Sequence, residues 1–201
     1  MNKSVVIVKY NAGNVRSVIC ALSRLGVDAV VSDDPKILKS ASRVIFPGVG
    51  EASTAMKYLR ESHLDEILVD LDNPFLGICL GLQLMCSRSQ EQDTPCLSIF
   101  PTEVNKFIPL NGEKIPHMGW NTIRCNQDYL FEGVADDSYC YFVHSYYAAR
   151  AKETIASCFY CGIEFSAALG SGNYRGVQFH PEKSGSVGHK ILENFIKGER
   201  L

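Results

Sequence analysis

Apolar segments that resemble β-strands alternate with segments that resemble α-helices through the first half of the chain. We expect strands at 4–10, 27–32, 43–50 and 74–79, and helices at 15–25, from Pro35 onward, and at 51–59. Parallel strands need a crossover connection, and that connection is usually a helix. The alternation therefore predicts an α/β fold with a mostly parallel central sheet and helices on both faces.

The second half changes to strand-like segments separated by turns. After about Thr94 come CLSIFPTEVNKF, IPHMGWNTIRC, CYFVHSYYAA, TIASCFY, FSAALG and YRGVQFHPE, divided by Gly, Asn, Asp and Pro. The GSGN stretch at 170–173 is typical of a hairpin turn, and one amphipathic helix is expected at 185–197. These segments predict additional antiparallel strands within a single domain that spans residues 1–201.

Composition argues against several classes of function. The 201 residues are 46% hydrophobic and 21% charged, with a net charge of -2, so the basic surface that nucleic acid requires is not expected. No apolar run approaches the roughly 18 residues of a membrane span. No segment resembles a secretory signal. We therefore expect a cytoplasmic protein that binds neither nucleic acid nor a membrane.

The eight cysteines predict neither disulfides nor a metal site. Thiols stay reduced in the cytosol. The one C-x-x-C pair, Cys158 and Cys161, lacks the further ligands of a zinc site, and on a strand its side chains would point to opposite faces. No H-E-x-x-H, G-x-G-x-x-G or Walker motif is present. We expect no metal and no cofactor.

Cys79 lies in the stretch GICLGLQL, where an apolar strand runs directly into an apolar helix. A sharp strand-to-helix turn of this kind exposes a nucleophile in hydrolases, and glycines on both sides allow neighbouring backbone to approach closely. At the start of a helix, the free amides favour the thiolate form of the cysteine. The Leu80 amide would then face the charge that develops on a bound carbonyl. The alternative is a thiol buried in the core.

His180 and Glu182, in VQFHPE, are the candidate base and its orienting carboxylate. If the strand continues through Pro181, its period of two places both side chains on one face. The carboxylate could then fix the imidazole tautomer while the other ring nitrogen faces the thiol. His144, in YFVHSYY, is the rival candidate but has no carboxylate nearby in sequence, and His63 is expected on the surface.

PGVG at 47–50, GICLGLQL at 77–84 and HPE at 180–182, in this order, resemble the motifs of class I glutamine amidotransferases. The resemblance implies a flavodoxin-like fold and a triad of Cys79, His180 and Glu182 that forms a glutamyl thioester and releases ammonia. It also implies an oxyanion amide from Val49 or Gly50. The glutamine contacts that it implies are Gln83, Glu91, Ser145 and Tyr146.

YNAGNVRSV, PGVGEA, HMGWN and YFVHSYY further resemble the glutaminase subunits of imidazole glycerol phosphate synthases. That resemblance implies a heterodimer with a (β/α)8 cyclase, which uses the ammonia to make imidazole glycerol phosphate and aminoimidazole carboxamide ribotide in histidine biosynthesis. Two alternatives remain open: a paralogue that serves surface-sugar amidotransfer, and a cysteine amide hydrolase without a partner. The candidate interface or signalling residues are Asn14, Trp120, Asn121, Tyr141 and Lys183.

Overall fold

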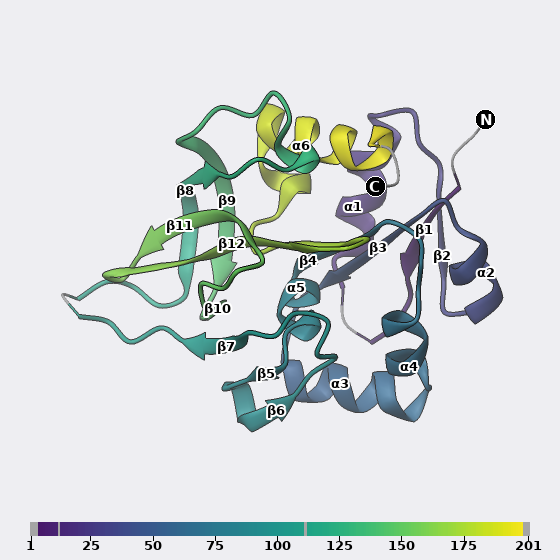
Figure 1. Ribbon diagram of the computed structural model, residues 1–201, viewed down its shortest axis with the longest axis horizontal. Helices are drawn as coiled ribbons and strands as arrows, with labels where there is room; N and C mark the ends of the chain where they lie inside the picture. Colours follow the sequence, from purple (N-terminus) through teal and green to yellow (C-terminus); the bar gives the residue numbers. More distant parts are fainter. Residues whose placement is uncertain (1–3, 12, 111, 199–201) are drawn as a thin grey trace.

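The computed structural model of the chain describes residues 4–11, 13–110 and 112–198. Within these residues nine strands form one sheet, in the order β2-β1-β3-β4-β13-β12-β11-β8-β9 (Figure 1). The strands, in that order, are Ala29–Ser32, Val5–Val8, Arg43–Gly48, Phe75–Cys79, Tyr174–Val177, Ile163–Ser171, Thr154–Tyr160, His117–Cys125 and Ser138–His144.

The sheet has a parallel half and an antiparallel half. Strands β2, β1, β3, β4 and β13 run parallel to one another. Strands β12, β11, β8 and β9 continue the sheet with antiparallel pairings, beginning at the β12–β13 hairpin predicted from GSGN. The predicted α/β fold with extra antiparallel strands in the second half is thus confirmed.

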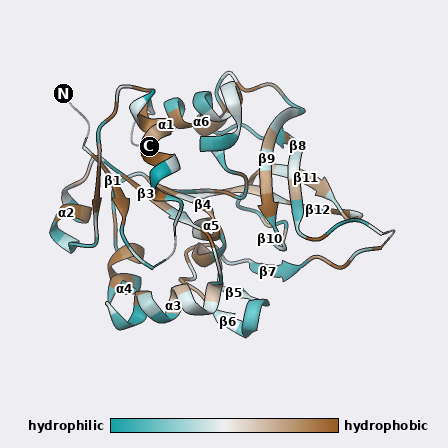
Figure 2. Ribbon diagram, turned by 180° about the vertical axis from the view of Figure 1, so that it is seen from behind, coloured by the Kyte–Doolittle hydropathy of each residue, from teal (hydrophilic) through white to brown (hydrophobic). Residues whose placement is uncertain are grey.

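Helices cover both faces of the parallel half, as the alternation predicted. The α-helices are α1 Val15–Ser23, α2 Pro35–Ser40, α3 Ala52–Glu61, α4 Leu64–Val69, α5 Leu80–Met85 and α6 Gly185–Lys197. Val5 and Ile7 of β1 pack into a core with α1 and α6, whereas Val6 and Val8 pack with α2 to α5. The period of two in β1 divides the two cores, and Figure 2 shows hydrophobic strands between the helical layers.

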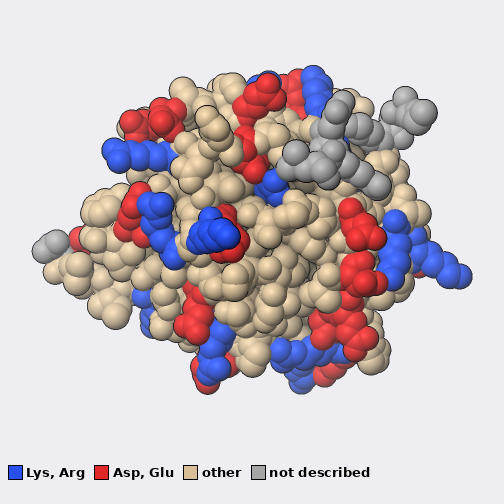
Figure 3. Space-filling model, in the orientation of Figure 1, with Lys and Arg blue, Asp and Glu red and all other residues tan. Residues whose placement is uncertain are grey.

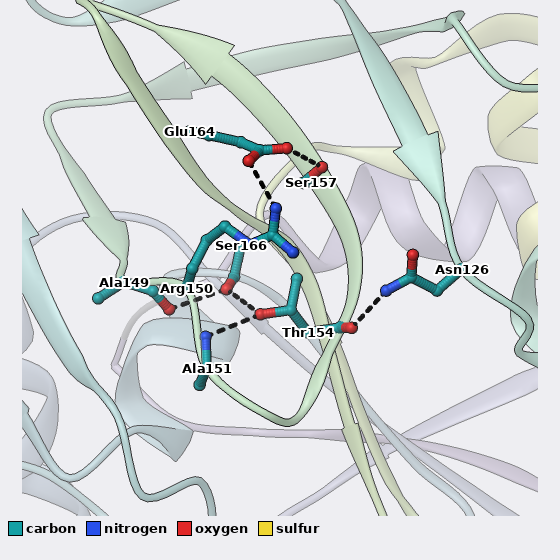
Figure 4. A network of polar contacts seen from close by, with 8 residues as sticks. All are labelled: Asn126, Ala149, Arg150, Ala151, Thr154, Ser157, Glu164 and Ser166. Atoms are coloured by element: carbon teal, nitrogen blue, oxygen red, sulfur yellow. Dashed lines mark hydrogen bonds and ion pairs between the residues drawn. The ribbon is translucent and has the colours of Figure 1, made fainter.

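A smaller sheet of four short strands lies beside the main one, in the order β10-β7-β5-β6. Its strands are Tyr146–Ala148, Glu103–Lys106, Arg88–Ser89 and Thr94–Pro95. The hydroxyl of Ser166 in β12 donates to the carbonyl of Ala149 at 2.8 Å, and it also contacts the hydroxyl of Thr154 at 2.7 Å (Figure 4). These contacts tie the end of β10 to the main sheet.

The observed elements differ from the expected ones in three places. Helix α4 was not predicted, because its six residues are too few to display a helical period. Residues 96–102 are not a strand, since Ser98 has a positive φ of 57° and Pro101 has no amide hydrogen to donate. Strand β13 ends at Val177, before the QFHPE that was expected to continue it.

Within the described ranges, no helix has both the length and the apolar character needed to cross a bilayer. The face of the molecule drawn in Figure 3 carries acidic and basic side chains that are interspersed. This distribution accords with the net charge of -2.

Candidate active site

Cys79 occupies a sharp turn between β4 and α5. Its backbone has φ 56° and ψ -109°, a conformation that residues other than glycine rarely adopt. Gly81 lets α5 approach β3, because a Cβ atom there would lie 1.9 Å from the carbonyl oxygen of Phe46. A Cβ atom at Gly77 would similarly meet the sulfur of Met85 at 2.5 Å. The two glycines beside Cys79 therefore allow the close packing that positions the strained turn.

His180 and Glu182 are joined by a hydrogen bond. His180 Nδ1 donates to Glu182 Oε1 at 2.8 Å, and both side chains are almost completely buried. The expected strand geometry through Pro181 is wrong, because β13 has already ended and Pro181–Lys183 forms a short 3-10 helix. This turn brings the carboxylate back to the ring, so the predicted pair forms by a different route.

The surroundings of His180 favour its protonated form. Burial alone would lower the pKa of this imidazole, but the adjacent Cys79 and Glu182 side chains raise it to about 10. Nε2 of His180 is buried and forms no hydrogen bond of ordinary geometry with the described residues. The Cys79 side chain therefore raises the pKa of the ring because it lies close to it. An imidazolium near a cysteine sulfur stabilises the thiolate, which is the nucleophilic form.

The sulfur of Cys79 has two further polar neighbours. Gln178 Nε2 donates toward it at 3.7 Å, and Sγ lies 3.9 Å from the carbonyl oxygen of Val143. The side chain is only 6% exposed, but it borders a pocket of about 360 Å³. Cys79 is thus part of the buried core, and its side chain also borders the pocket.

Most of the predicted site residues border this one pocket. It is lined by Val49, Gly50, Cys79, Leu80, Gln83, Glu91, Pro116, Val143, His144, Ser145, Tyr146 and His180. The chain thus brings together the loop after β3, the end of β4, α5, the end of β9 and the turn after β13 at the carboxyl end of the parallel strands. Crevices at this edge are the usual ligand sites of open α/β sheets.

The loop after β3 supplies the wall that contains Val49 and Gly50. Gly50 has a φ of 105°, and the Val49 side chain is 41% exposed. The hydroxyl of Tyr10 donates to the Pro47 carbonyl at 2.8 Å and so fixes the start of the loop. Leu80, Val49 and Gly50, whose amides are the predicted oxyanion donors, all line the pocket that Cys79 borders.

The four candidate glutamine contacts differ in their environments. Gln83 is buried, and its amide nitrogen donates to the Tyr146 carbonyl at 2.8 Å and to Gln178 Oε1 at 3.0 Å. Glu91 accepts a hydrogen bond from the Ala52 amide at 2.7 Å. Burial raises the pKa of Glu91, with a smaller opposite effect of that hydrogen bond. Ser145 and Tyr146 also line the pocket.

Four of the candidate interface residues gather beside the triad. Asn14 Nδ2 donates to Glu182 Oε1 at 3.4 Å. The ammonium of Lys183 lies 5.8 Å from the ring centre of Tyr141, whose ring is 5.9 Å from that of Trp120. Trp120 is 54% exposed, which excludes core packing for it. Asn121 is separate, since its amide nitrogen donates to the carbonyl of Phe159 at 3.0 Å.

The remaining histidine and cysteine candidates have other surroundings. His63 is exposed, and His144 is hydrogen-bonded to His117 and the Tyr146 carbonyl. Cys158 and Cys161 are buried free thiols. In the part of the chain that the structure describes, no group of three or more metal-binding side chains lies together.

Several residues of the site were not predicted. Gln178 contacts both Cys79 and Gln83, and its position two residues before His180 is the signal that could have identified it. Tyr10, whose hydroxyl donates to the Pro47 carbonyl, begins the YNAGNVRSV stretch but was not singled out as a site residue. Pro116 and Val143 reach the pocket from distant segments, and spacing in sequence does not reveal such contacts.

Comparison with known proteins gives the family. Residues 6–198 match the family model for glutamine amidotransferase class-I. Relatives named imidazole glycerol phosphate synthase subunit HisH include one from Bacteroides fragilis, 53% identical over 194 residues, covering 96% of this chain and 98% of its own length. Another, from Shewanella loihica, is 44% identical, with 98% and 91% covered.

A solved structure of PurLQS from Thermotoga maritima has the same fold. Its chain aligns with a TM-score of 0.71 at 18% identity, and the match covers 98% of each chain. The family model spans almost the whole chain, and the named relatives agree with one another. The chain therefore belongs to the class I glutamine amidotransferase family and, within it, to the HisH subunits of imidazole glycerol phosphate synthase.

Proposed function

We propose that this chain hydrolyses L-glutamine to glutamate and ammonia with Cys79, His180 and Glu182 as its catalytic triad. The observation that carries the proposal is the buried imidazole–carboxylate pair, 2.8 Å apart, whose ring lies beside a cysteine held in a strained strand-to-helix turn. Nucleophile, base and orienting group are the three parts that covalent amide hydrolysis requires.

In the first half of the reaction, the Cys79 thiolate attacks the side-chain carbonyl carbon of glutamine. The resulting oxyanion is held by the amide of Leu80 and by an amide of the loop at Val49 or Gly50. Protonated His180 transfers its Nε2 proton to the amide nitrogen, so that ammonia leaves and a glutamyl thioester remains. Glu182 stabilises the imidazolium through Nδ1 and keeps Nε2 directed at the site.

In the second half, water hydrolyses the thioester. Neutral His180 takes a proton from water as the oxygen attacks the thioester carbonyl, and the same backbone amides hold the new oxyanion. Collapse of this intermediate expels the Cys79 thiolate and releases glutamate, which restores the thiolate–imidazolium pair. The sum is one glutamine and one water converted to one glutamate and one ammonia.

The pocket suits the amino-acid end of glutamine. The Glu91 carboxylate can pair with the α-ammonium group, and the backbone at Ser145 and Tyr146 offers further polar groups in the pocket lining. Gln83 supports this backbone through its hydrogen bond to the Tyr146 carbonyl at 2.8 Å. We assign Glu91, Ser145 and Tyr146 to direct contact with glutamine, and Gln83 to the support of Tyr146.

We further propose that the ammonia passes to a (β/α)8 cyclase subunit in a cytoplasmic heterodimer. The names of the relatives at 44% to 53% identity support this partner over a surface-sugar synthetase or free hydrolysis. The partner would convert the ribotide substrate into imidazole glycerol phosphate and aminoimidazole carboxamide ribotide, so the lyase chemistry belongs to it. Trp120, Tyr141 and Lys183 offer it an exposed aromatic and basic surface beside the triad.

The test is ammonia release from glutamine by the chain alone, with the cyclase, and with the cyclase plus its ribotide ligand. Cys79→Ala is the control for the nucleophile. Release that depends on Cys79 and rises when the cyclase and ribotide are added supports both proposals. Release that depends on Cys79 but ignores the cyclase would overturn the partner assignment alone, and release that persists in Cys79→Ala would overturn the triad.

A further inference from the structure

Two buried histidines form a hydrogen-bonded pair that the proposed reaction does not use. His117 begins β8 and His144 ends the neighbouring strand β9, where they face each other in the register. His117 Nδ1 lies 3.0 Å from His144 Nε2. His144 Nδ1 lies 2.7 Å from the Tyr146 carbonyl oxygen, and His117 Nε2 lies 3.2 Å from Asn121 Nδ2.

The directions of these hydrogen bonds follow from the one group that can only accept. Because the Tyr146 carbonyl has no proton, His144 Nδ1 must donate to it. Burial lowers the pKa of His144 to about 3 and that of His117 to about 4, so both rings are neutral near pH 7. Nε2 of His144 is then an acceptor, and His117 Nδ1 must donate to it.

Asn121 lies at the other end of this series of hydrogen bonds. Its amide nitrogen donates to His117 Nε2 and to the Phe159 carbonyl at 3.0 Å, while its Oδ1 accepts from the Thr122 amide at 2.8 Å. Every polar atom of both imidazole rings therefore has a partner. Asn121, His117 and His144 all donate in one direction, toward the carbonyl of Tyr146.

Aromatic packing holds the His117 ring in this orientation. It stacks on Tyr160 with ring centres 3.9 Å apart and on Phe142 at 4.8 Å. His144 lies against Phe107 and Phe165, each about 5.4 Å away. Rings enclosed on their faces cannot rotate without loss of this packing, so the donor direction is fixed.

The acceptor at the end of this series of hydrogen bonds is part of the pocket wall. The Tyr146 carbonyl receives hydrogen bonds from His144 and from Gln83, whose amide also contacts Gln178 beside the Cys79 sulfur. The peptide after Tyr146 is thereby held from two sides. Ser145 and Tyr146 are the residues to which the proposed function assigns one wall of glutamine binding.

We propose that His117 and His144 are positioning residues: as a pair of neutral, Nδ1-protonated rings, they fix the backbone at Ser145 and Tyr146 in the conformation that binds glutamine. The inference rests on the proposed glutaminase function. It predicts an effect on glutamine binding rather than on the chemical step, because neither ring is needed for proton transfer at Cys79.

The first test is the tautomeric state, which does not depend on activity. Nitrogen-15 NMR of the histidine rings at pH 7 should show Nδ1 protonated and Nε2 unprotonated for both residues, whereas free imidazole side chains favour the opposite tautomer. The variants His117→Asn and His144→Asn assign the signals. An Nε2-protonated His144 would overturn the proposed series of hydrogen bonds.

The second test separates binding from catalysis. In the complex with the cyclase, His144→Leu should raise the KM for glutamine by about 10-fold, the equivalent of one hydrogen bond, while kcat changes by less than about 3-fold. His144→Asn keeps a donor where Nδ1 lies and should recover most of the loss. Calorimetry of glutamine binding to His144→Leu and His144→Asn, each in the Cys79→Ala background, should show the same ratio of affinities between the two variants.

Equal effects of His144→Leu and His144→Asn, or a fall in kcat alone, would overturn the inference while leaving the proposed function intact. No ammonia release by the wild-type complex would overturn the proposed function and this inference with it. Thermal unfolding shows whether His144→Leu folds. If it does not, His117→Leu against His117→Asn is the equivalent pair, because His117 touches neither the pocket nor Tyr146.

Discussion

The carboxylate of Glu182 accepts a hydrogen bond from His180 at 2.8 Å within a single 3-10 turn, and Asn14 approaches the same oxygen at 3.4 Å. The carboxylate is thus held by its own turn and by the residue that precedes α1. A carboxylate fixed in this way keeps the imidazole in one tautomer with Nε2 directed toward the thiol. The remaining oxygen, Oε2, is buried and has no hydrogen-bond partner among the described residues.

Glu182→Gln should reduce kcat for glutamine hydrolysis by about 10²- to 10⁴-fold, because the amide cannot stabilise the imidazolium and can stabilise the wrong tautomer. The folded structure should be retained, since Gln has almost the same shape. Ammonia release in the presence of the cyclase measures the effect. Glu66→Gln on the exposed side of α4 is the control. A kcat within a few-fold of wild type would show that Glu182 does not orient His180.

Gly81→Ala should destabilise the chain by about 2–4 kcal/mol and abolish the reactivity of Cys79, because the new Cβ atom meets backbone that cannot move aside. The atom in question, the Phe46 carbonyl oxygen, would lie 1.9 Å away. Gly26→Ala is the comparison variant: its φ of 72° adds backbone strain to alanine, but no atom lies within 4 Å of the new Cβ, so it should lose less stability than Gly81→Ala. Urea unfolding of both variants makes the comparison. Similar losses in the two would contradict the close approach of α5 to β3.

Acid should destabilise the folded chain partly through His117 and His144. Their folded-state pKa values of about 4 and about 3 lie below the ordinary value of 6.5. Between pH 6.5 and these lower values, the two histidines bind protons in the unfolded chain but not in the folded chain. Their contribution to the free energy of unfolding is therefore fully present above pH 6.5 and is lost as the pH falls. Each histidine contributes a slope of at most about 1.4 kcal/mol per pH unit.

His117→Leu should therefore flatten the dependence of the unfolding free energy on pH between 6.5 and 4.5, whatever its effect at pH 7. Urea titrations at several pH values in this range give the slope. His189→Gln on the exposed face of α6 serves as the control variant. An unchanged slope in His117→Leu would mean that this histidine is not held neutral in the fold.

Trp120→Ala should weaken binding of the cyclase by about 10- to 100-fold, as expected for an aromatic anchor at an interface. Because the side chain is 54% exposed, the unfolding free energy should change little. Surface plasmon resonance with immobilised cyclase measures the affinity. Ile37→Ala, an exposed apolar residue of α2, should leave it unchanged. Equal affinities for wild type and Trp120→Ala would place the interface elsewhere.

The parts of the site that the residues themselves predicted depend on local geometry. The glycines around Cys79 and the short spacing from His180 to Glu182 can be interpreted from neighbouring residues alone, whereas the role of the loop at Val49 was implied only by the family resemblance. Even so, the His180–Glu182 contact formed through a turn, because Pro181 stops the strand ladder. Strands β1 to β4 were predictable for the same reason, since helices separate them in the sequence. The parallel pairing of β13 with β4 was not, because β13 follows β12 through a hairpin.

The parts that were missed depend on contacts between distant segments. The pairing of His117 with His144 requires the β8–β9 register, and Tyr10 reaches Pro47 across two parallel strands. Strands β5 and β6 have two residues each, too few to show a period of two. Such features are set by tertiary packing, which spacing along one chain does not encode.

The most direct measurement of the central claim is the site of covalent attack by a diazoketone analogue of glutamine, determined by mass spectrometry of the intact chain and its peptides in the cyclase complex. We predict a single adduct, on Cys79, that glutamine suppresses, that is absent from Cys79→Ala and that forms more slowly in His180→Asn. An adduct on any of the other seven cysteines instead, or labelling that glutamine does not suppress, would contradict Cys79 as the nucleophile that binds glutamine.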